Sequence, residues 1–372
     1  MATSAHAPRP DLVDWVGLRL VPGVGSLTFA RLLAAFGAPG AALGAPQAQL
    51  QALGLRADLA QAVHARAWAA DPAAQIADLA ALGGRALTWD DADYPPLLRA
   101  IYAPPPVIFA RGDLAGCRAG GVALVGSRNM SQYGRRVAED LARDLARAGV
   151  SVISGLARGV DTAAHRAALM AGGHTVGVLG CGLDVDYPPE NRDLAEEMAR
   201  RGAVVSEFPL GMAPLAGNFP ARNRVISGLS RAVVVVEAGL KSGALITARH
   251  ALDQGREVFA VPGPVAAAQS QGCHALIRQG ARLLSSAHDL LAPGALPPAP
   301  AGAAEPDAAA GAGAELPAEA AALLGLIGPA PVHVDVLARE GGLRPQEATA
   351  LLINLELAGL VEQKPGKFYV RC

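Results

Sequence analysis

The alternation of short apolar runs with helical segments is the feature of this sequence that most restricts its fold. From Gly121 onward, apolar runs of strand length end in small residues, and helical segments such as YGRRVAEDLARDLARAG separate them; the runs are GVALVG, VSVISG, TVGVLG, AVVSEFP, AVVVVEAG and EVFAVPG. Continuous apolar strands divided by amphipathic helices are typical of a parallel sheet that helices cover on both faces. We therefore expect a doubly wound α/β domain whose ligands bind beyond the carboxyl ends of its strands.

The segments on either side of this pattern predict two smaller domains and a linker. Residues 12–37 (LVDWVGLRLVPGVGSLTFARLLAAFG) predict two short helices around a Pro-Gly turn, a helix-hairpin-helix pattern. A tract rich in Pro, Ala and Gly predicts a flexible linker, and the segment after it predicts short helices and a hairpin at Lys364-Pro365-Gly366, as in a winged helix. The expected domains are a helical domain of the helix-hairpin-helix/SAM-like type (1–84), the sheet domain (85–291), the linker (292–314) and a winged-helix domain (315–372).

Composition limits the possible partners. The chain has 372 residues, of which 51% are hydrophobic and 17% charged, as expected of several globular domains. Its net charge of −1 gives no overall attraction to polyanions, so any nucleic-acid surface must be a local patch of cations. The 4 cysteines show no CxxC pair and no His at zinc spacing, so we expect no metal, no cofactor and a reducing compartment.

The N-terminal segment has no apolar core and the run AVVVV is too short to span a bilayer, which predicts a cytoplasmic protein without a membrane span.

Cations and small residues gather in the segments that adjoin the predicted strands. The stretch from Phe208 to Val236 contains no Asp or Glu, yet its segment FPARNRVISGLS carries an Arg on either side of an Asn. The first predicted strand ends in Gly-Ser-Arg rather than GxGxxG, which disfavours a dinucleotide site. The candidate ligand-binding residues are Gly126, Ser127, Arg128, Ser154, Gly155, Arg158, Phe219, Arg222, Asn223, Arg224, Lys241, Ser242, Gly243 and Thr247.

These residue types together predict the binding of a polyanion. Backbone N–H groups at helix starts, hydroxyl groups and guanidinium groups are the donors that phosphate oxygens require. The cations are too many for one phosphate and suit a nucleic-acid strand that crosses the loops; ordinary solvated arginines are the alternative, which leaves the acid-free stretch unexplained. Phe219 either stacks on a base or packs in the core, and Tyr187 either rests against a base or closes its loop. Asp161 is expected to cap the helix that follows it.

Several of these segments together resemble the bacterial DNA processing protein A (DprA/Smf) family. They are GSR (126–128), SGLARGVD (154–161), GLDVDYP (182–188), FPARNRVISGLS (219–230) and SGALITARHALDQGREVFAVPG (242–263). They occur in the family's order, within residues 85–290, and the flanking helical and winged-helix segments look like that family's arrangement. The resemblance implies an extended Rossmann-like domain that binds single-stranded DNA, protects incoming DNA, forms homodimers and loads the RecA recombinase during natural transformation and homologous recombination.

The resemblance also implies roles for particular residues. Arg128 and the region of Arg222 and Arg224 match the family's DNA pocket. One departure is that Ala216-Gly217-Asn218 stands where family members commonly carry a Lys just before the Phe-Pro pair. One phosphate contact is therefore expected to be missing, or to be made by Arg222 instead.

Two other functions remain open from the sequence. Related Rossmann-like folds include nucleotide phosphoribohydrolases that use an Arg and a Glu beside a glycine-rich loop, and Glu237 ends a predicted strand near such a loop. A nucleotide-sensing module is the other alternative. A hydrolase needs a paired acid or base to activate water, and these loops contain neither a His–carboxylate pair nor a metal-ligand spacing. We therefore expect a binding protein rather than an enzyme.

The two flanking domains have less defined roles. The turn at Pro22–Gly25 either makes a weak contact with duplex DNA through backbone N–H groups or is only a tight turn. The segment RPQEATALLINLELAGL, the expected recognition helix of the winged helix, has one Arg and two Glu and so lacks a basic face. A protein contact or a packing role is expected for it.

Overall fold

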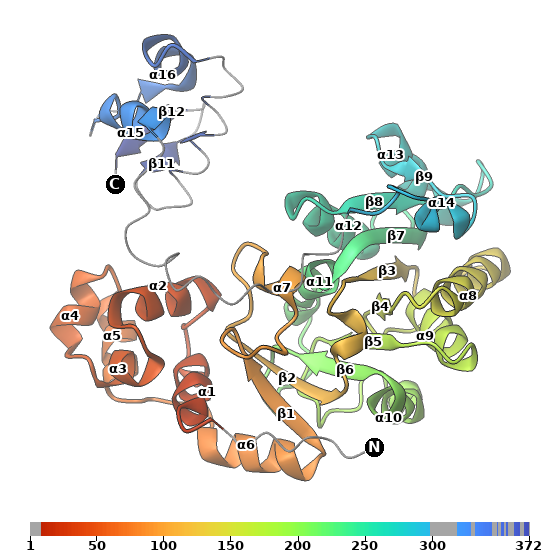
Figure 1. Ribbon diagram of the computed structural model, residues 1–372, viewed down its shortest axis with the longest axis horizontal. Helices are drawn as coiled ribbons and strands as arrows, with labels where there is room; N and C mark the ends of the chain where they lie inside the picture. Colours follow the sequence, from red (N-terminus) through yellow and green to blue (C-terminus); the bar gives the residue numbers. More distant parts are fainter. Residues whose placement is uncertain are drawn as a thin grey trace. The chain divides into compact units, whose positions relative to one another are not determined.

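The computed structural model describes residues 9–297, 318–328, 332–343, 348, 351–352, 355, 361–364 and 368–371 (Figure 1). The chain divides into two compact units, Met1–Pro306 and Asp307–Cys372, and each is described by itself. Within the described residues, Cys117, Cys181 and Cys273 are buried free thiols. None of the helices in these ranges combines the length and the hydropathy that a bilayer-spanning segment requires.

The first unit begins with short helices packed around an aromatic cluster. These helices are α1 (Leu12–Leu20), α2 (Ser26–Phe36), α3 (Pro39–Gly44), α4 (Gln47–Ala52), α5 (Ala57–His64) and α6 (Pro72–Ala81). Trp15 of α1 stacks on Phe29 of α2 with the ring centroids 5.2 Å apart, and Trp89 meets both rings edge-on. Because Trp89 directly follows the first strand of the sheet, the helices and the sheet share one hydrophobic core.

A nine-stranded sheet forms the centre of this unit. Its strands are β1 (Gly84–Thr88), β2 (Val107–Gly112), β3 (Gly121–Gly126), β4 (Val152–Ser154), β5 (Thr175–Leu179), β6 (Ala203–Ser206), β7 (Ser230–Glu237), β8 (Glu257–Ala260) and β9 (Arg282–Leu283). They lie in the order β1-β2-β6-β5-β4-β3-β7-β8-β9. Neighbouring strands from β6 across to β9 pair in parallel, and β1 and β2 add an antiparallel edge next to β6. The chain thus leaves β3 in one direction through β4, β5 and β6, and returns to place β7 on the other side of β3.

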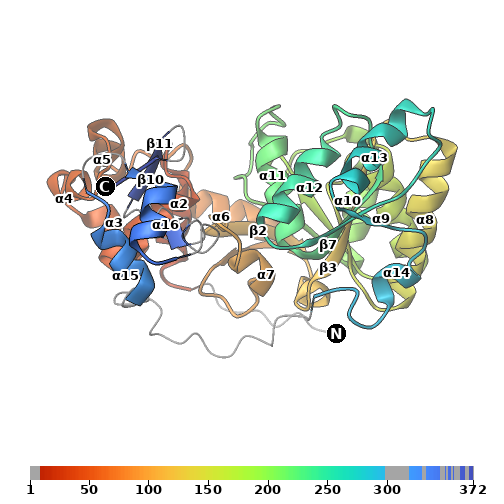
Figure 2. The same ribbon diagram turned by 90° about the horizontal axis from the view of Figure 1, so that it is seen from above.

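Helices cover both faces of this sheet. They are α7 (Pro96–Arg99), α8 (Gln132–Arg147), α9 (Val160–Met170), α10 (Arg192–Arg201), α11 (Asn218–Gly228), α12 (Ala244–Asp253), α13 (Gln271–Arg278) and α14 (His288–Leu291). Leu124 of β3 shares one core cluster with Leu141 of α8, and Val233 of β7 shares the other with Ile226 of α11 and Ala248 of α12. Figure 2 shows α8 and α9 on one side of the strands and α11 and α12 on the other. The predicted doubly wound parallel sheet is confirmed, and the edge strands β1 and β2 are an addition that the sequence did not reveal.

The second unit has the element order of a winged helix. Its described elements are α15 (Ala318–Gly325), β10 (Val332–His333), α16 (Val334–Glu340), β11 (Val361–Lys364) and β12 (Phe368–Arg371). The strands form a small antiparallel sheet in the order β10-β12-β11, over a core that includes Leu323, Leu337 and Tyr369. Most of the expected recognition segment, and the Pro365-Gly366 tip of the hairpin, lie outside the described residues.

The beginning of the predicted linker packs against the sheet domain. The Arg282 guanidinium donates a hydrogen bond to the carbonyl oxygen of Ala295 at 2.8 Å, and Arg231 Nε donates to that of Pro297 at 2.7 Å. Ala295 is buried, and Leu296 packs on the cluster beneath α8 and α14. The expectation that the linker begins at residue 292 is therefore wrong by at least these six residues, 292–297.

This contact predicts how far the chain can be shortened. A chain that ends at Pro297 should unfold at the same temperature as the full chain. A chain that ends at Leu291 should unfold at a lower temperature, because Arg231 and Arg282 lose their acceptors and the apolar surface under Ala295 becomes exposed. Thermal unfolding of both chains, followed by circular dichroism, checks this; equal midpoints would contradict it.

Candidate nucleic-acid interface

A crevice lies at the point where the direction of winding reverses, between the carboxyl ends of β3 and β7. In open α/β sheets this reversal opens a gap between the loops that follow the two strands, and ligands bind there. The crevice has a volume of ≈ 660 Å³. Most of the predicted site residues line it: Gly126, Ser127, Arg128, Phe219, Arg222, Asn223, Lys241, Ser242, Gly243 and Thr247.

Backbone contacts hold the loops around this crevice. Ser127 N donates to the carbonyl oxygen of Glu237 at 2.8 Å, and Val160 N donates to that of Ser127 at 3.2 Å. Gly159 has a positive φ of 78°, and a Cβ at this position would overlap the Ser127 carbonyl oxygen. The glycine is thus required for the close approach of the loop before α9 to the loop after β3.

Glu237, the carboxylate that a phosphoribohydrolase-like enzyme would need, is bonded to the N-terminus of α8. It is buried, and it accepts hydrogen bonds from Ser131 Oγ at 2.5 Å and from Ser131 N at 3.1 Å. Ser131 is the N-cap of α8, and its hydroxyl oxygen also accepts a bond from Gly134 N at 3.0 Å. Glu237 therefore stabilises a helix N-terminus, and it is not among the residues that line the crevice.

Arg222 forms part of the wall and floor of the crevice rather than an exposed contact. Only 5% of the residue is exposed, and its guanidinium donates to the carbonyl oxygens of Gly155, at 2.6 Å, and Val178. Burial lowers the pKa of Arg222 to about 10, while the buried carboxylate of Asp161 opposes that shift. The guanidinium thus joins the carboxyl ends of β4 and β5. Arg222 was expected to contact a phosphate, but the structure uses its Nε and Nη1 donors inside the protein, on Asn223 Oδ1 and on these two carbonyl oxygens.

Asp161 completes this buried group. Its carboxylate accepts hydrogen bonds from Gly155 N at 3.1 Å and from Ala157 N at 3.3 Å. Burial raises its pKa, and the positive charge of Arg222 opposes the rise. Asp161 therefore fixes the loop that precedes α9, whereas the sequence predicted that it caps the helix itself.

Ser154 and Gly155 are also parts of this framework. Ser154 is fully buried, and its hydroxyl donates to the carbonyl oxygen of Leu124 at 2.6 Å. A Cβ on Gly155 would lie 2.7 Å from the guanidinium of Arg222. The expectation that these two residues face a phosphate is wrong, because their polar groups are already paired inside the protein.

Arg224 lies outside the crevice and forms a nearly buried ion pair. Its guanidinium contacts the carboxylate of Glu207 and donates to the carbonyl oxygen of Ala103 at 2.7 Å. The side chains of Arg224 and Glu207 are 19% and 6% exposed. Glu207 is the residue just before the acid-free stretch, so Arg224, which was expected to contact a phosphate, has a carboxylate partner inside the protein instead. Positions two apart on a helix face nearly opposite directions, which is why Arg222 and Arg224 of α11 have different partners.

Phe219 connects the crevice to its most exposed arginine. The ring is partly buried, 5.4 Å from the ring centroid of Tyr187, with Arg128 at 5.4 Å and Arg222 at 5.9 Å from its own centroid. Arg128 is exposed and, within the described residues, has neither an ion pair nor a side-chain hydrogen bond. Contact with an aromatic ring limits the positions of a guanidinium without using its donors. Arg128 is thus held at the crevice with its donors free.

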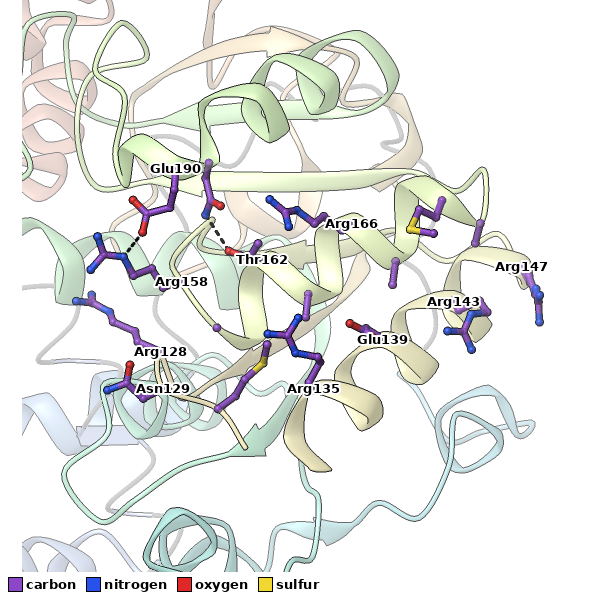
Figure 3. A pocket seen from close by; sticks show the side chains of 17 residues that line it. Arg128, Asn129, Arg135, Glu139, Arg143, Arg147, Arg158, Thr162, Arg166 and Glu190 are labelled. Carbon is purple, nitrogen blue, oxygen red and sulfur yellow. Dashed lines mark hydrogen bonds and ion pairs between the residues drawn. The ribbon is translucent and has the colours of Figure 1, made fainter. Parts of the chain in front are cut away.

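A second cavity, which the sequence did not reveal, adjoins the crevice between α8 and α9. We call it the α8/α9 groove; its volume is ≈ 710 Å³, and Arg128 and Asn129 line both it and the crevice. Figure 3 shows arginine side chains from both helices around it. Its charged lining residues are Arg128, Arg135, Glu139, Arg143, Arg147, Arg158, Arg166 and Glu190. Arg158, expected at the crevice, lies here instead and pairs with Glu190.

The ion pair of Arg224 yields a prediction about stability. The change Arg224→Ala leaves the carboxylate of Glu207 buried without its partner, which should lower the free energy of unfolding by about 3 kcal/mol. Urea unfolding measures this, and the change Arg278→Ala at an exposed position of α13 is the control. Adding Glu207→Gln should recover part of the loss, because a neutral amide costs less to bury. An unchanged unfolding midpoint for Arg224→Ala would contradict the structural role.

Comparison with known proteins identifies the family. The model for DNA recombination-mediator protein A matches residues 85–293, and that for the DprA winged helix domain matches residues 297–367. Protein Smf of Escherichia coli is 44% identical over 289 residues, which cover 76% of each chain. DNA processing protein DprA of Streptococcus pneumoniae is 46% identical over 199 residues, 54% of this chain and 70% of that protein.

Solved structures agree with these sequence matches. DprA from Streptococcus pneumoniae superimposes with a TM-score of 0.67 at 35% identity, covering 75% of this chain and 97% of that chain. DNA processing protein A from Helicobacter pylori, described with a unique single-stranded DNA binding mode, gives a TM-score of 0.51 at 30% identity, over 55% of this chain and 94% of that chain. On the strength of the sequence match across the sheet domain, this chain belongs to the DNA recombination-mediator protein A family, whose bacterial members include the proteins named DprA and Smf.

Proposed function

We propose that this protein binds single-stranded DNA at the crevice, protects incoming DNA and loads the RecA recombinase onto it during natural transformation and homologous recombination. The observation that carries the proposal is the position of Arg128, an exposed cation with free donors at the switch point of the sheet. The Helicobacter pylori relative, described as binding single-stranded DNA, supports the choice of polyanion. The RecA step, a homodimer formed through the sheet domain and a cytoplasmic location belong to the same proposal, and their support is the resemblance to the family.

The crevice offers a single strand several kinds of contact. Arg128 and Lys241 provide positive charge, while Ser127 and Ser242 provide hydroxyl groups. Lys241 is exposed at the loop before α12, and Gly243 follows it closely, so the backbone can approach a phosphate there. Arg222 contributes its charge from beneath, with its Nε and Nη1 donors bonded inside the protein. The phosphate contact expected of Arg222 is therefore assigned to Arg128 and Lys241.

The lining of the crevice favours binding over hydrolysis. Asp161 is the only carboxylate among the described lining residues, which include no His and no Cys. That carboxylate is buried and held by two backbone N–H groups. Water activation by a general base requires a carboxylate or imidazole within reach of the reacting water. The carboxylate of Asp161 is bonded to the backbone of its own loop instead, so it does not meet this requirement.

Replacement of the exposed cations tests the proposal. If Arg128 and Lys241 each contact one phosphate, Arg128→Ala and Lys241→Ala should each weaken oligo-dT binding and reduce the slope of log affinity against log salt by about 0.7. The change Arg278→Ala removes the same charge far along the chain and should leave the slope unchanged. Fluorescence anisotropy over a salt titration measures both quantities. If Arg128→Ala and Lys241→Ala bind like the parent at every salt concentration, the crevice is not the DNA site.

Phe219 provides a second test that separates stacking from positioning. If its ring stacks on a base, Phe219→Ala should weaken oligo-dT binding by about 1 to 3 kcal/mol with the salt slope unchanged. If the ring only positions Arg128, the slope should fall as it does for Arg128→Ala. Phe219→Leu, which keeps apolar bulk but removes the aromatic face, should behave like the Ala variant in the first case. The same salt titration distinguishes these results.

A further inference from the structure

The α8/α9 groove contains more free positive charge than the crevice itself. Six arginines and two glutamates line it, and Arg135 and Arg166 are exposed without an ion pair or side-chain hydrogen bond among the described residues. Arg143 pairs only with Asp140 of its own helix, at 2.7 Å, in an exposed contact of little strength. The groove therefore presents guanidinium groups that the fold does not need for its own stability.

The packing of small residues explains why these arginines from two helices border one groove. Ala138 and Ala142 of α8 share a buried cluster with Ala163, Ala164 and Ala167 of α9. Small side chains allow two helix axes to approach closely. The long side chains on the outer flanks of the helices then stand on both sides of a shallow groove, as Figure 3 shows for Arg135 and Arg166.

The groove and the crevice are continuous at one residue pair. Arg128 and Asn129 line both cavities, and the loop at Gly159, which is held against Ser127, adjoins them. A polyanion bound at Arg128 therefore reaches Arg135 and Arg166 without leaving the surface of the sheet domain. The described lining of the groove has no aromatic side chain, so its contacts would be made to the phosphate backbone and not to stacked bases.

We propose that the α8/α9 groove is a second segment of the single-strand path, which takes the phosphate backbone of DNA as it leaves the crevice past Arg128. The inference rests on the proposed function of the crevice. Short strands fill the crevice alone, and longer strands also occupy the groove. The open shape of the groove and its separate exposed arginines suit an extended backbone rather than one compact phosphate.

The pair of Arg158 and Glu190 lies where this path would run. Both side chains are largely exposed, at 62% and 49%, and the hydrogen bond from Arg158 keeps the pKa of Glu190 low. A passing phosphate would compete with Glu190 for the guanidinium of Arg158. The carboxylate thus opposes DNA in the groove, and its removal should strengthen the binding of long strands.

Two oligonucleotide lengths separate the groove from the crevice. The paired change Arg135→Ala/Arg166→Ala should weaken binding of an oligo-dT of about 16 nucleotides roughly tenfold and reduce its salt slope by about 1.4, because two phosphate contacts are lost. Binding of an oligo-dT of about 6 nucleotides should not change. Glu190→Gln should tighten binding of the longer strand alone. Arg278→Ala is the charge-matched control, and equal thermal midpoints show that the variants are folded.

The outcomes distinguish this inference from the proposed function. If Arg128→Ala weakens the binding of both lengths but the paired groove variant changes neither affinity, the groove is not part of the DNA path, and an acidic protein surface becomes the partner that its charge suits. If Arg128→Ala affects neither length, the proposed function itself fails. Equal weakening of both lengths by the groove variant would also overturn a separate second segment.

Discussion

The candidate site depends on one buried cation. The guanidinium of Arg222 donates to the carbonyl oxygens of Gly155 and Val178, which lie at the carboxyl ends of neighbouring strands. Carbonyl groups at strand ends lack a partner from the ladder, and leaving them unpaired in the interior would be costly. Arg222 satisfies them, and the Asp161 carboxylate balances its charge while it fixes the loop before α9. The same guanidinium lies against Phe219, whose ring contacts Arg128. A buried charge thus determines where an exposed charge is held.

The arginines of the first unit divide into those that the fold uses and those that it leaves free. Arg222 donates to buried carbonyl groups, and Arg224 pairs with Glu207 and donates to the carbonyl oxygen of Ala103. Removing either side chain should lower the stability of the fold. Arg128, Arg135 and Arg166 are exposed and unpaired within the described residues, so their loss should cost little stability. The distance in sequence to an acidic residue does not predict which arginines are free. Burial and the acceptors that surround each guanidinium in the fold decide it.

The sequence was enough to predict the parallel sheet, but it was not enough to predict which arginines are free to contact a ligand and which stabilise the fold. Strands β3 to β8 follow from apolar runs that only a sheet buried on both faces would contain, and their carboxyl ends locate the crevice. Strand β1 (GRALT) has no such run. The partners of Arg222 and Arg224 could not be predicted, because they depend on the direction in which α11 presents each residue. The groove did leave a signal, since Arg135, Glu139, Arg143 and Arg147 recur every four residues on one face of α8. What the sequence could not show is that Arg166 of α9 stands opposite.

A chain with a net charge of −1 can still attract a polyanion, because electrostatic interactions across water are local. At physiological ionic strength the screening length is about 8 Å, so acidic residues on distant surfaces do not cancel the potential at the crevice and the groove. What matters is the charge within that distance of the path. Along the groove, Glu139 and Glu190 are the only carboxylates in the described lining, and Glu190 is paired to Arg158. Such a surface would attract the backbone of a strand while the rest of the molecule carries net negative charge, which limits nonspecific association with other polyanions.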